Sequence, residues 1–172
     1  MKYVIDACNL MFMHSPLEDA LDRDGFPAAR ALLVRMLTRF AYSENLDEVV
    51  AVFDGSEKAA HHPRRQREAS GRVILIYADP RTDADNFIIE LVEDAQRPGE
   101  ITVVSNDKFI VRHAQRAGGH VLSCGGFLRK MKRSAEHAAD PLDGEDPQKY
   151  NGLSQREVEE WAKIFGIDLT KE

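Results

Sequence analysis

Acidic side chains recur where apolar segments of this chain end. Asp6, Asp54 and Asp107 each stand within three residues of the end of a short run of Val, Ile, Phe or Tyr. Asp83 and Asp85 open a segment whose later apolar residues have helical spacing. Because ligand sites in open parallel sheets lie outside the carboxyl ends of the strands, we expect these carboxylates to share one edge of a sheet.

Several carboxylates at one edge would repel one another unless a cation lay among them. Hard oxygen ligands without a Cys/His cluster favour Mg²⁺ or Mn²⁺. Such ions hold phosphate oxygens and lower the pKa of a bound water. The pattern therefore predicts phosphodiester hydrolysis, and it also permits nucleotide binding without cleavage.

Each acid has an ordinary structural explanation as well. Asp54 with Gly55 forms a common turn pair. The other acids suit the capping of helix N-termini, or the acceptance of backbone N–H groups in a loop. Capping accounts for each acid singly, but it does not account for their recurrence after successive strands.

The segments that must position these acids alternate in type. Strands are predicted at 3–5, 48–53, 72–77, 100–104 and 120–123, where short apolar, β-branched runs occur. Helices are predicted at 28–42, 84–96 and 108–117, where apolar residues recur at helical spacing. This alternation predicts an α/β fold with a mostly parallel sheet.

The chain divides into three parts by composition. Residues 1–137 hold the alternating segments and form the predicted domain, and 138–152 read as a polar linker rich in Pro, Gly and Asp. Residues 153–166 are a predicted C-terminal amphipathic helix with Val158, Trp161 and Phe165 on its apolar stripe. That stripe either packs on the domain or mediates a homodimer.

The composition is that of a soluble globular protein. The formal net charge is −6, so binding of a nucleic acid requires a local basic patch. No apolar run approaches the ~18 residues of a membrane span, and no signal-peptide pattern is present. Cys8 and Cys124 do not make a disulfide framework. We therefore expect a cytoplasmic protein without a membrane partner.

Segment 58–72 is basic and follows Asp54, so it starts near the predicted acidic edge. A basic loop beside a metal site suits a phosphate backbone, although a solvated surface loop has the same composition. Arg30 and Lys108 have the same two interpretations: each either contacts a phosphate or is an ordinary surface charge. The predicted phosphate contacts are Arg30, Lys58, Arg64, Arg65 and Lys108.

Two other chemistries fit the sequence poorly. Cys8 lacks the His/Asp partner pattern of a cysteine nucleophile, so both cysteines are interpreted as small buried residues. A phosphatase with an aspartyl nucleophile needs a second acid two residues after the first, in an Asp-x-Asp pair. Here the residue two positions after Asp6 is Cys8, so this pair is absent.

Four blocks, VIDACNLM, VAVFDG, TDADNFIIE and VVSNDKFI, stand in an order that resembles the NYN/PIN-like nuclease superfamily. The resemblance is to the YacP-like NYN domain family and covers about residues 1–130. It implies a three-layer α/β/α PIN-like, Rossmann-like fold with a central mostly parallel sheet. It also implies a metal-dependent endoribonuclease.

The resemblance also implies roles for individual residues. Asp6, Asp54, Asp85 and Asp107 match the acids that hold one or two Mg²⁺ or Mn²⁺ ions, with a metal-bound water attacking the RNA phosphodiester. Asn9 matches the asparagine that orients the first acid or a phosphate. The five basic residues named above would then contact RNA. Asp83 has no clear counterpart and is assigned to capping or to the surroundings of the ligands.

One block departs from the usual pattern. The opening acid is followed here by Ala7-Cys8, where these families usually have Gly-Tyr. Together with the acidic net charge, this departure supports an alternative: an RNA- or ribosome-associated NYN binding module with weak or no catalysis.

Overall fold

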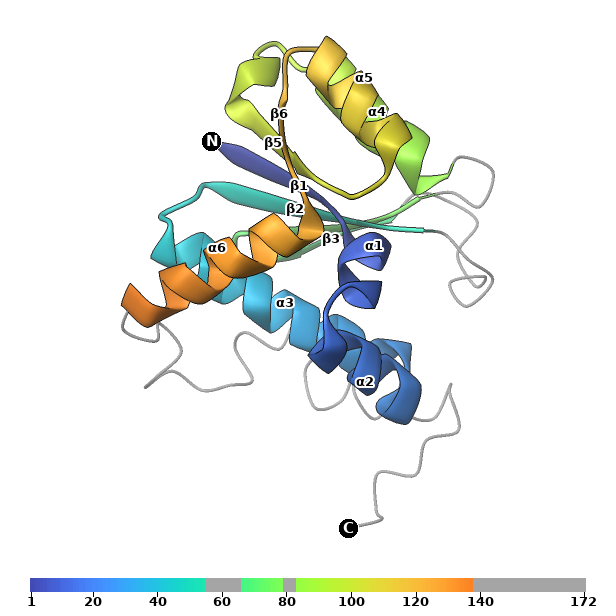
Figure 1. The fold of residues 1–172 in the computed structure, drawn as a ribbon, viewed down its shortest axis with the longest axis vertical. Helices are drawn as coiled ribbons and strands as arrows, with labels where there is room; N and C mark the ends of the chain where they lie inside the picture. The colour runs from blue at the N-terminus through green and yellow to red at the C-terminus, as the bar shows by residue number, and fades with distance from the viewer. Residues whose placement is uncertain (55–65, 79–82, 138–172) are drawn as a thin grey trace.

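The computed structural model describes residues 1–54, 66–78 and 83–137. These residues form a six-stranded sheet with helices on both faces (Figure 1). In spatial order the strands are β3 (Gln66–Ser70), β4 (Val73–Tyr77), β2 (Glu48–Phe53), β1 (Lys2–Asp6), β5 (Ile101–Val104) and β6 (His120–Leu122). All neighbours pair in parallel except β3, which runs antiparallel to β4. The predicted three-layer, mostly parallel α/β fold is confirmed.

Helices cover the two faces of the sheet as two separate layers. One layer consists of α1 (Ala7–Phe12), α2 (Ser15–Asp24), α3 (Phe26–Ser43) and α6 (Cys124–His137). The other consists of α4 (Ala84–Glu93) and α5 (Lys108–Arg116), while the short 3₁₀ helix η2 (Pro98–Glu100) precedes β5. None of the described helices is long and apolar enough to span a bilayer.

The central strand β1 is buried on both faces, which is why its sequence is a continuous apolar run. Tyr3 and Ile5 belong to the core under α1, α2, α3 and α6, whereas Val4 belongs to the core under α4 and α5. Both faces of the strand are therefore buried, as expected of a parallel sheet between two helical layers. The strand ends at Asp6, whose carboxylate caps α1.

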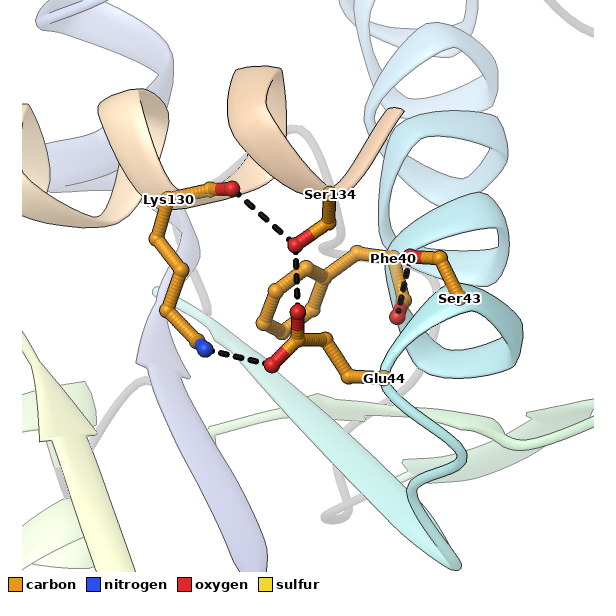
Figure 2. A network of polar contacts seen from close by, with 5 residues as sticks. All are labelled: Phe40, Ser43, Glu44, Lys130 and Ser134. Atoms are coloured by element: carbon orange, nitrogen blue, oxygen red, sulfur yellow. Dashed lines mark hydrogen bonds and ion pairs between the residues drawn. The ribbon is translucent and has the colours of Figure 1, made fainter. Parts of the chain in front are cut away.

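Aromatic and polar contacts fix α6 to the sheet and to α3. The ring of Phe127 lies 5.0 Å from that of Phe40 and 5.8 Å from that of Tyr3, measured between centroids. Nearby, the Glu44 carboxylate at the end of α3 accepts hydrogen bonds from Lys130 and Ser134 of α6 (Figure 2). These donors lower the pKa of Glu44. The last described helix is thus part of the domain core.

The structure differs from the sequence-based prediction in four elements. Helices α1, α2 and α6 were not predicted, and β3 occupies part of segment 58–72, which was predicted to be a loop. Helix α1 is too short for its periodicity to stand out, and the first turn of α6 contains two glycines, which are poor helix formers. A Cβ on Gly126 would lie 2.9 Å from Leu122 Cδ1, so a larger residue there would displace the leucine side chain.

Other boundaries shift by a few residues or remain untested. The helix predicted at 84–96 ends at Glu93, and the strand predicted at 100–104 begins after η2. The predicted linker 138–152 and C-terminal helix 153–166 lie outside the described residues. The division of the chain at residue 137 therefore stays a prediction.

Truncation of Phe127 tests whether α6 belongs to the core. Phe127 is fully buried, so we expect Phe127→Ala to lower the free energy of unfolding by about 3–5 kcal/mol. Urea unfolding followed by circular dichroism measures this loss. Phe109 is 52% exposed, and the matched control Phe109→Ala should change stability by less than about 0.5 kcal/mol. Equal losses in the two variants would contradict the assignment.

Candidate functional site

Five carboxylates lie along the edge where the parallel strands end. Asp6 is the last residue of β1, Asp54 follows β2, and Asp107 lies just beyond β5. Asp83 and Asp85 stand at the start of α4. Since β1 lies between β2 and β5 and all three run in parallel, their ends meet on one side of the sheet. We call these five residues the acidic edge.

Asp6 is the buried member of the acidic edge, with 6% of its surface exposed. Its Oδ1 accepts the backbone N–H of Asn9 at 3.0 Å, and its Oδ2 accepts the hydroxyl of Ser105 at 3.0 Å. Burial raises the pKa of Asp6, these donors oppose that rise, and the charge of Asp107 adds to it. The carboxylate is thus held rigidly in one orientation.

Ser105 was missed in the sequence analysis, although it stands two residues before Asp107. Its side chain is buried, and its Oγ accepts the backbone N–H of Asp107 at 3.0 Å while its hydroxyl donates to Asp6. A serine between a strand and a helix gives no sequence signal beyond a turn. In the structure it links two of the acids through one hydroxyl.

Asn9 and Cys124 complete the surroundings of Asp6. The side chain of Asn9 also hydrogen-bonds to Asp6, and its Oδ1 accepts the Cys124 thiol at 3.5 Å. Asn9 therefore lies where it can orient Asp6, and it connects that acid to α6. Burial and the charge of Asp6 raise the pKa of Cys124 to about 11, so its thiol stays protonated.

Like Cys124, Cys8 has a raised thiol pKa, which does not suit a nucleophile. Burial is the main cause that raises the pKa of its thiol, and the charges of Asp6 and Asp54 raise it further. Reactive cysteines have the opposite property, a lowered thiol pKa. With Ala7, Cys8 forms the first turn of α1, so the departure from the usual motif falls inside a helix.

Besides Asp6, which caps α1, two more acids cap helices, as their ordinary explanation requires. The Asp83 Oδ1 accepts the N–H of Asn86 at 2.9 Å, at the start of α4. The Asp107 Oδ1 accepts the N–H groups of Phe109 at 2.6 Å and Ile110 at 3.2 Å, at the start of α5. In both cases one carboxylate oxygen is used for capping. Among the described residues, no donor engages the second oxygen.

The pKa of Asp85 depends on burial and on the charges of all the other members of the acidic edge. It is half-buried in the first turn of α4, and its pKa is raised to about 6. Burial is the largest cause, followed by the charges of the other four acids. Within the described part of the chain, no Lys or Arg forms an ion pair with any member of the acidic edge. The negative charge there is therefore not compensated by described side chains.

The acidic edge fits a hard divalent cation in charge and in donor type, because it offers carboxylate oxygens and an uncompensated field. Its residues do not yet form a coordination shell. Across 1–54, 66–78 and 83–137, no three His, Cys, Asp or Glu side chains lie close enough together to hold an ion. The candidate ligands are Asp6, Asp54, Asp85 and Asp107.

The predicted phosphate contacts have different positions. The Arg30 guanidinium is 11% exposed and donates to the Tyr77 hydroxyl and the Glu68 carboxylate. It therefore joins α3 to β3 and β4 rather than projecting as a free cation. Lys108 is exposed at the first residue of α5, beside Asp107. The remaining three, Lys58, Arg64 and Arg65, lie outside the described residues.

The sheet topology and the acids at its edge are those of a nuclease-like α/β domain. The model of the YacP-like NYN domain family matches residues 3–166, and the chain belongs to this family. The family predicted from the sequence is thus confirmed.

Two solved structures share the fold. One is the crystal structure of a tryptophan-to-leucine mutant of Rae1 (YacP) from Bacillus subtilis, 20% identical, with a TM-score of 0.62 over 95% of this chain and 99% of that one. The other is Rae1 (YacP) from the same organism, 16% identical, with a TM-score of 0.63 over 96% of this chain and 84% of that one. No curated protein matches the chain.

The raised pKa of Asp85 leads to a pH-dependent stability. The folded state holds this proton more tightly than the unfolded state, so its contribution to stability is lost as pH rises from about 4 to about 6. The two-unit shift corresponds to about 3 kcal/mol, which solvent screening of this partly exposed group reduces to about 1 kcal/mol. With chelator present, Asp85→Asn should therefore exceed wild type in free energy of unfolding at about pH 8, but not at about pH 4.

Urea titrations across that pH range measure the difference. Asp19, an exposed acid of α2, provides the matched control Asp19→Asn. The control should show no comparable pH-dependent gain. A difference between Asp85→Asn and wild type that is constant with pH would contradict the proposed field at the acidic edge.

Proposed function

We propose that this protein is a Mg²⁺- or Mn²⁺-dependent endoribonuclease that acts in the cytoplasm. One observation carries the proposal: the acidic edge gathers five carboxylates, and burial together with the charges of the other four raises the pKa of Asp85 to about 6. Membership of a nuclease-like family supports the same reaction class. When bound, a divalent ion would neutralise this charge, hold phosphate oxygens and lower the pKa of a water.

In this proposal four acidic side chains bind the metal ion. Asp6 is the central ligand because Asn9 and Ser105 fix both of its oxygens. Asp54, Asp85 and Asp107 supply the other carboxylates. Carboxylate oxygens accept more than one contact each, so capping and hydrogen bonding leave capacity for an ion.

Phosphate contacts come from cations near this edge. Lys108 is exposed beside Asp107 and is suited to hold a substrate phosphate. Lys58, Arg64 and Arg65 are proposed to contribute further contacts. Arg30 acts indirectly, since its bond to Glu68 anchors β3, which forms part of the basic segment 58–72.

A second function rests on a different observation. No coordination shell is preformed among the described carboxylates, and the net charge of −6 opposes tight binding of RNA. These properties favour an RNA- or ribosome-associated binding module with weak or no catalysis. Incubation of RNA with the protein and Mn²⁺, with and without chelator, separates the two, because only an enzyme gives chelator-sensitive cleavage.

The Asp107→Asn variant tests the catalytic proposal. Asn caps helices about as well as Asp, so this substitution removes the charge and keeps the start of α5. We expect Mn²⁺-dependent RNA cleavage to fall by at least about 100-fold. The rate of cleavage of a labelled RNA, measured at saturating Mn²⁺, reports this loss.

Asp83→Asn is the matched control, because Asp83 caps α4 in the same manner and is not assigned as a ligand. It should retain most of the wild-type cleavage rate. Circular dichroism of both variants verifies the fold. Cleavage by Asp107→Asn at the wild-type rate would refute the ligand assignment.

A further inference from the structure

A groove of about 430 Å³ lies between α3 and α6, on the layer of the domain that carries α1 and α2. Met36 and Phe40 of α3 and Leu128 and Met131 of α6 supply its apolar lining. His14, which precedes α2, also lines it. Neither the acidic edge nor the proposed phosphate contacts include any of these residues.

The walls of this groove are fixed rather than adaptable. Phe40 packs edge-on against Phe127 with 5.0 Å between ring centroids, which buries its ring between the helices. The bonds from Lys130 and Ser134 to Glu44 clamp α6 onto α3 next to the groove (Figure 2). A partner would therefore meet a preformed surface and would not have to order it.

The charged side chains that line the groove are basic. Arg129 and Lys132 are exposed on α6 and stand three residues apart, on one side of the helix. Arg39 of α3 also lines the groove. No acidic side chain is among the described residues that line it. An occupant with an apolar stripe and acidic flanks would complement this surface.

We propose that the groove binds the chain's own C-terminal segment, residues 153–166, as an amphipathic helix. Val158, Trp161 and Phe165 recur at helical spacing and would fill the apolar groove. At 3.6 residues per turn, Glu157 lies beside this stripe, next to Trp161, whereas Glu159 and Glu160 lie toward the far side of the helix. Glu157 would face the cations of the rim.

Chain connectivity favours this occupant over a separate molecule. Helix α6 ends at His137, and Ala135 in its last turn already lines the groove. Residues 138–152 reach at most about 50 Å when fully extended, which keeps the segment near the groove at high effective concentration. The family match also extends to residue 166, so the segment is part of the family's domain.

Trp161 is the only tryptophan of the chain, so its fluorescence reports directly on the segment. In the full-length protein we expect a blue-shifted emission maximum and weak quenching by acrylamide. Leu128→Glu, which places a carboxylate in the groove, should shift the emission to the red and increase quenching by at least about twofold. Arg112→Glu alters an exposed residue of α5 on the opposite layer and should change neither.

A charge exchange tests the orientation without touching the apolar contacts. Arg129→Glu with Lys132→Glu should expose Trp161, and adding Glu157→Lys should restore the protected emission. Glu160→Lys, on the far side of the predicted helix, should not restore it. Failure of Glu157→Lys to restore the emission would overturn the proposed docking.

Other outcomes would also overturn it. A solvent-like emission in the wild-type protein, or an emission unaffected by Leu128→Glu, would show that the segment lies elsewhere. Emission that depends on protein concentration, with a dimer mass in light scattering, would show that a second copy occupies the groove. None of these measurements depends on RNA cleavage.

Discussion

Repulsion among the five carboxylates of the acidic edge is the constraint on which the site depends. The fold buries Asp6 at the end of β1, where, among the described residues, Asn9 and Ser105 donate to its oxygens. Burial, and after it the charges of the other four acids, raise the pKa of Asp85 to about 6. Such an arrangement costs stability unless a cation neutralises it, and this cost is the physical reason to propose a metal site there.

The same positions serve structure and site together. Parallel strands bring helix N-termini to the edge where the strands end, and acids are favourable there for capping alone. Asp83 and Asp107 show that capping is real. Capping uses one carboxylate oxygen in each case, so it does not compete with a ligand role. The contact between Cys124 and Asn9 extends this arrangement to α6.

Sequence periodicity was sufficient to predict the fold class, because strands buried on both faces and amphipathic helices carry strong signals. It did not predict β3, whose exposed edge residues resemble a loop, or α6, whose glycines disfavour helix. The acids were recognised by their positions after strands. The role of Ser105 and the burial of Arg30 against Glu68 depend on contacts between segments distant in the chain, which no local pattern encodes.

The most direct test of the central claim is a crystal structure of the full chain soaked with Mn²⁺, with anomalous scattering used to locate the ion. We expect one or two anomalous peaks enclosed by Asp6, Asp54, Asp85 and Asp107, with carboxylate oxygens at about 2.0–2.3 Å. Absence of a peak at saturating Mn²⁺, or a peak held by other residues, would contradict it.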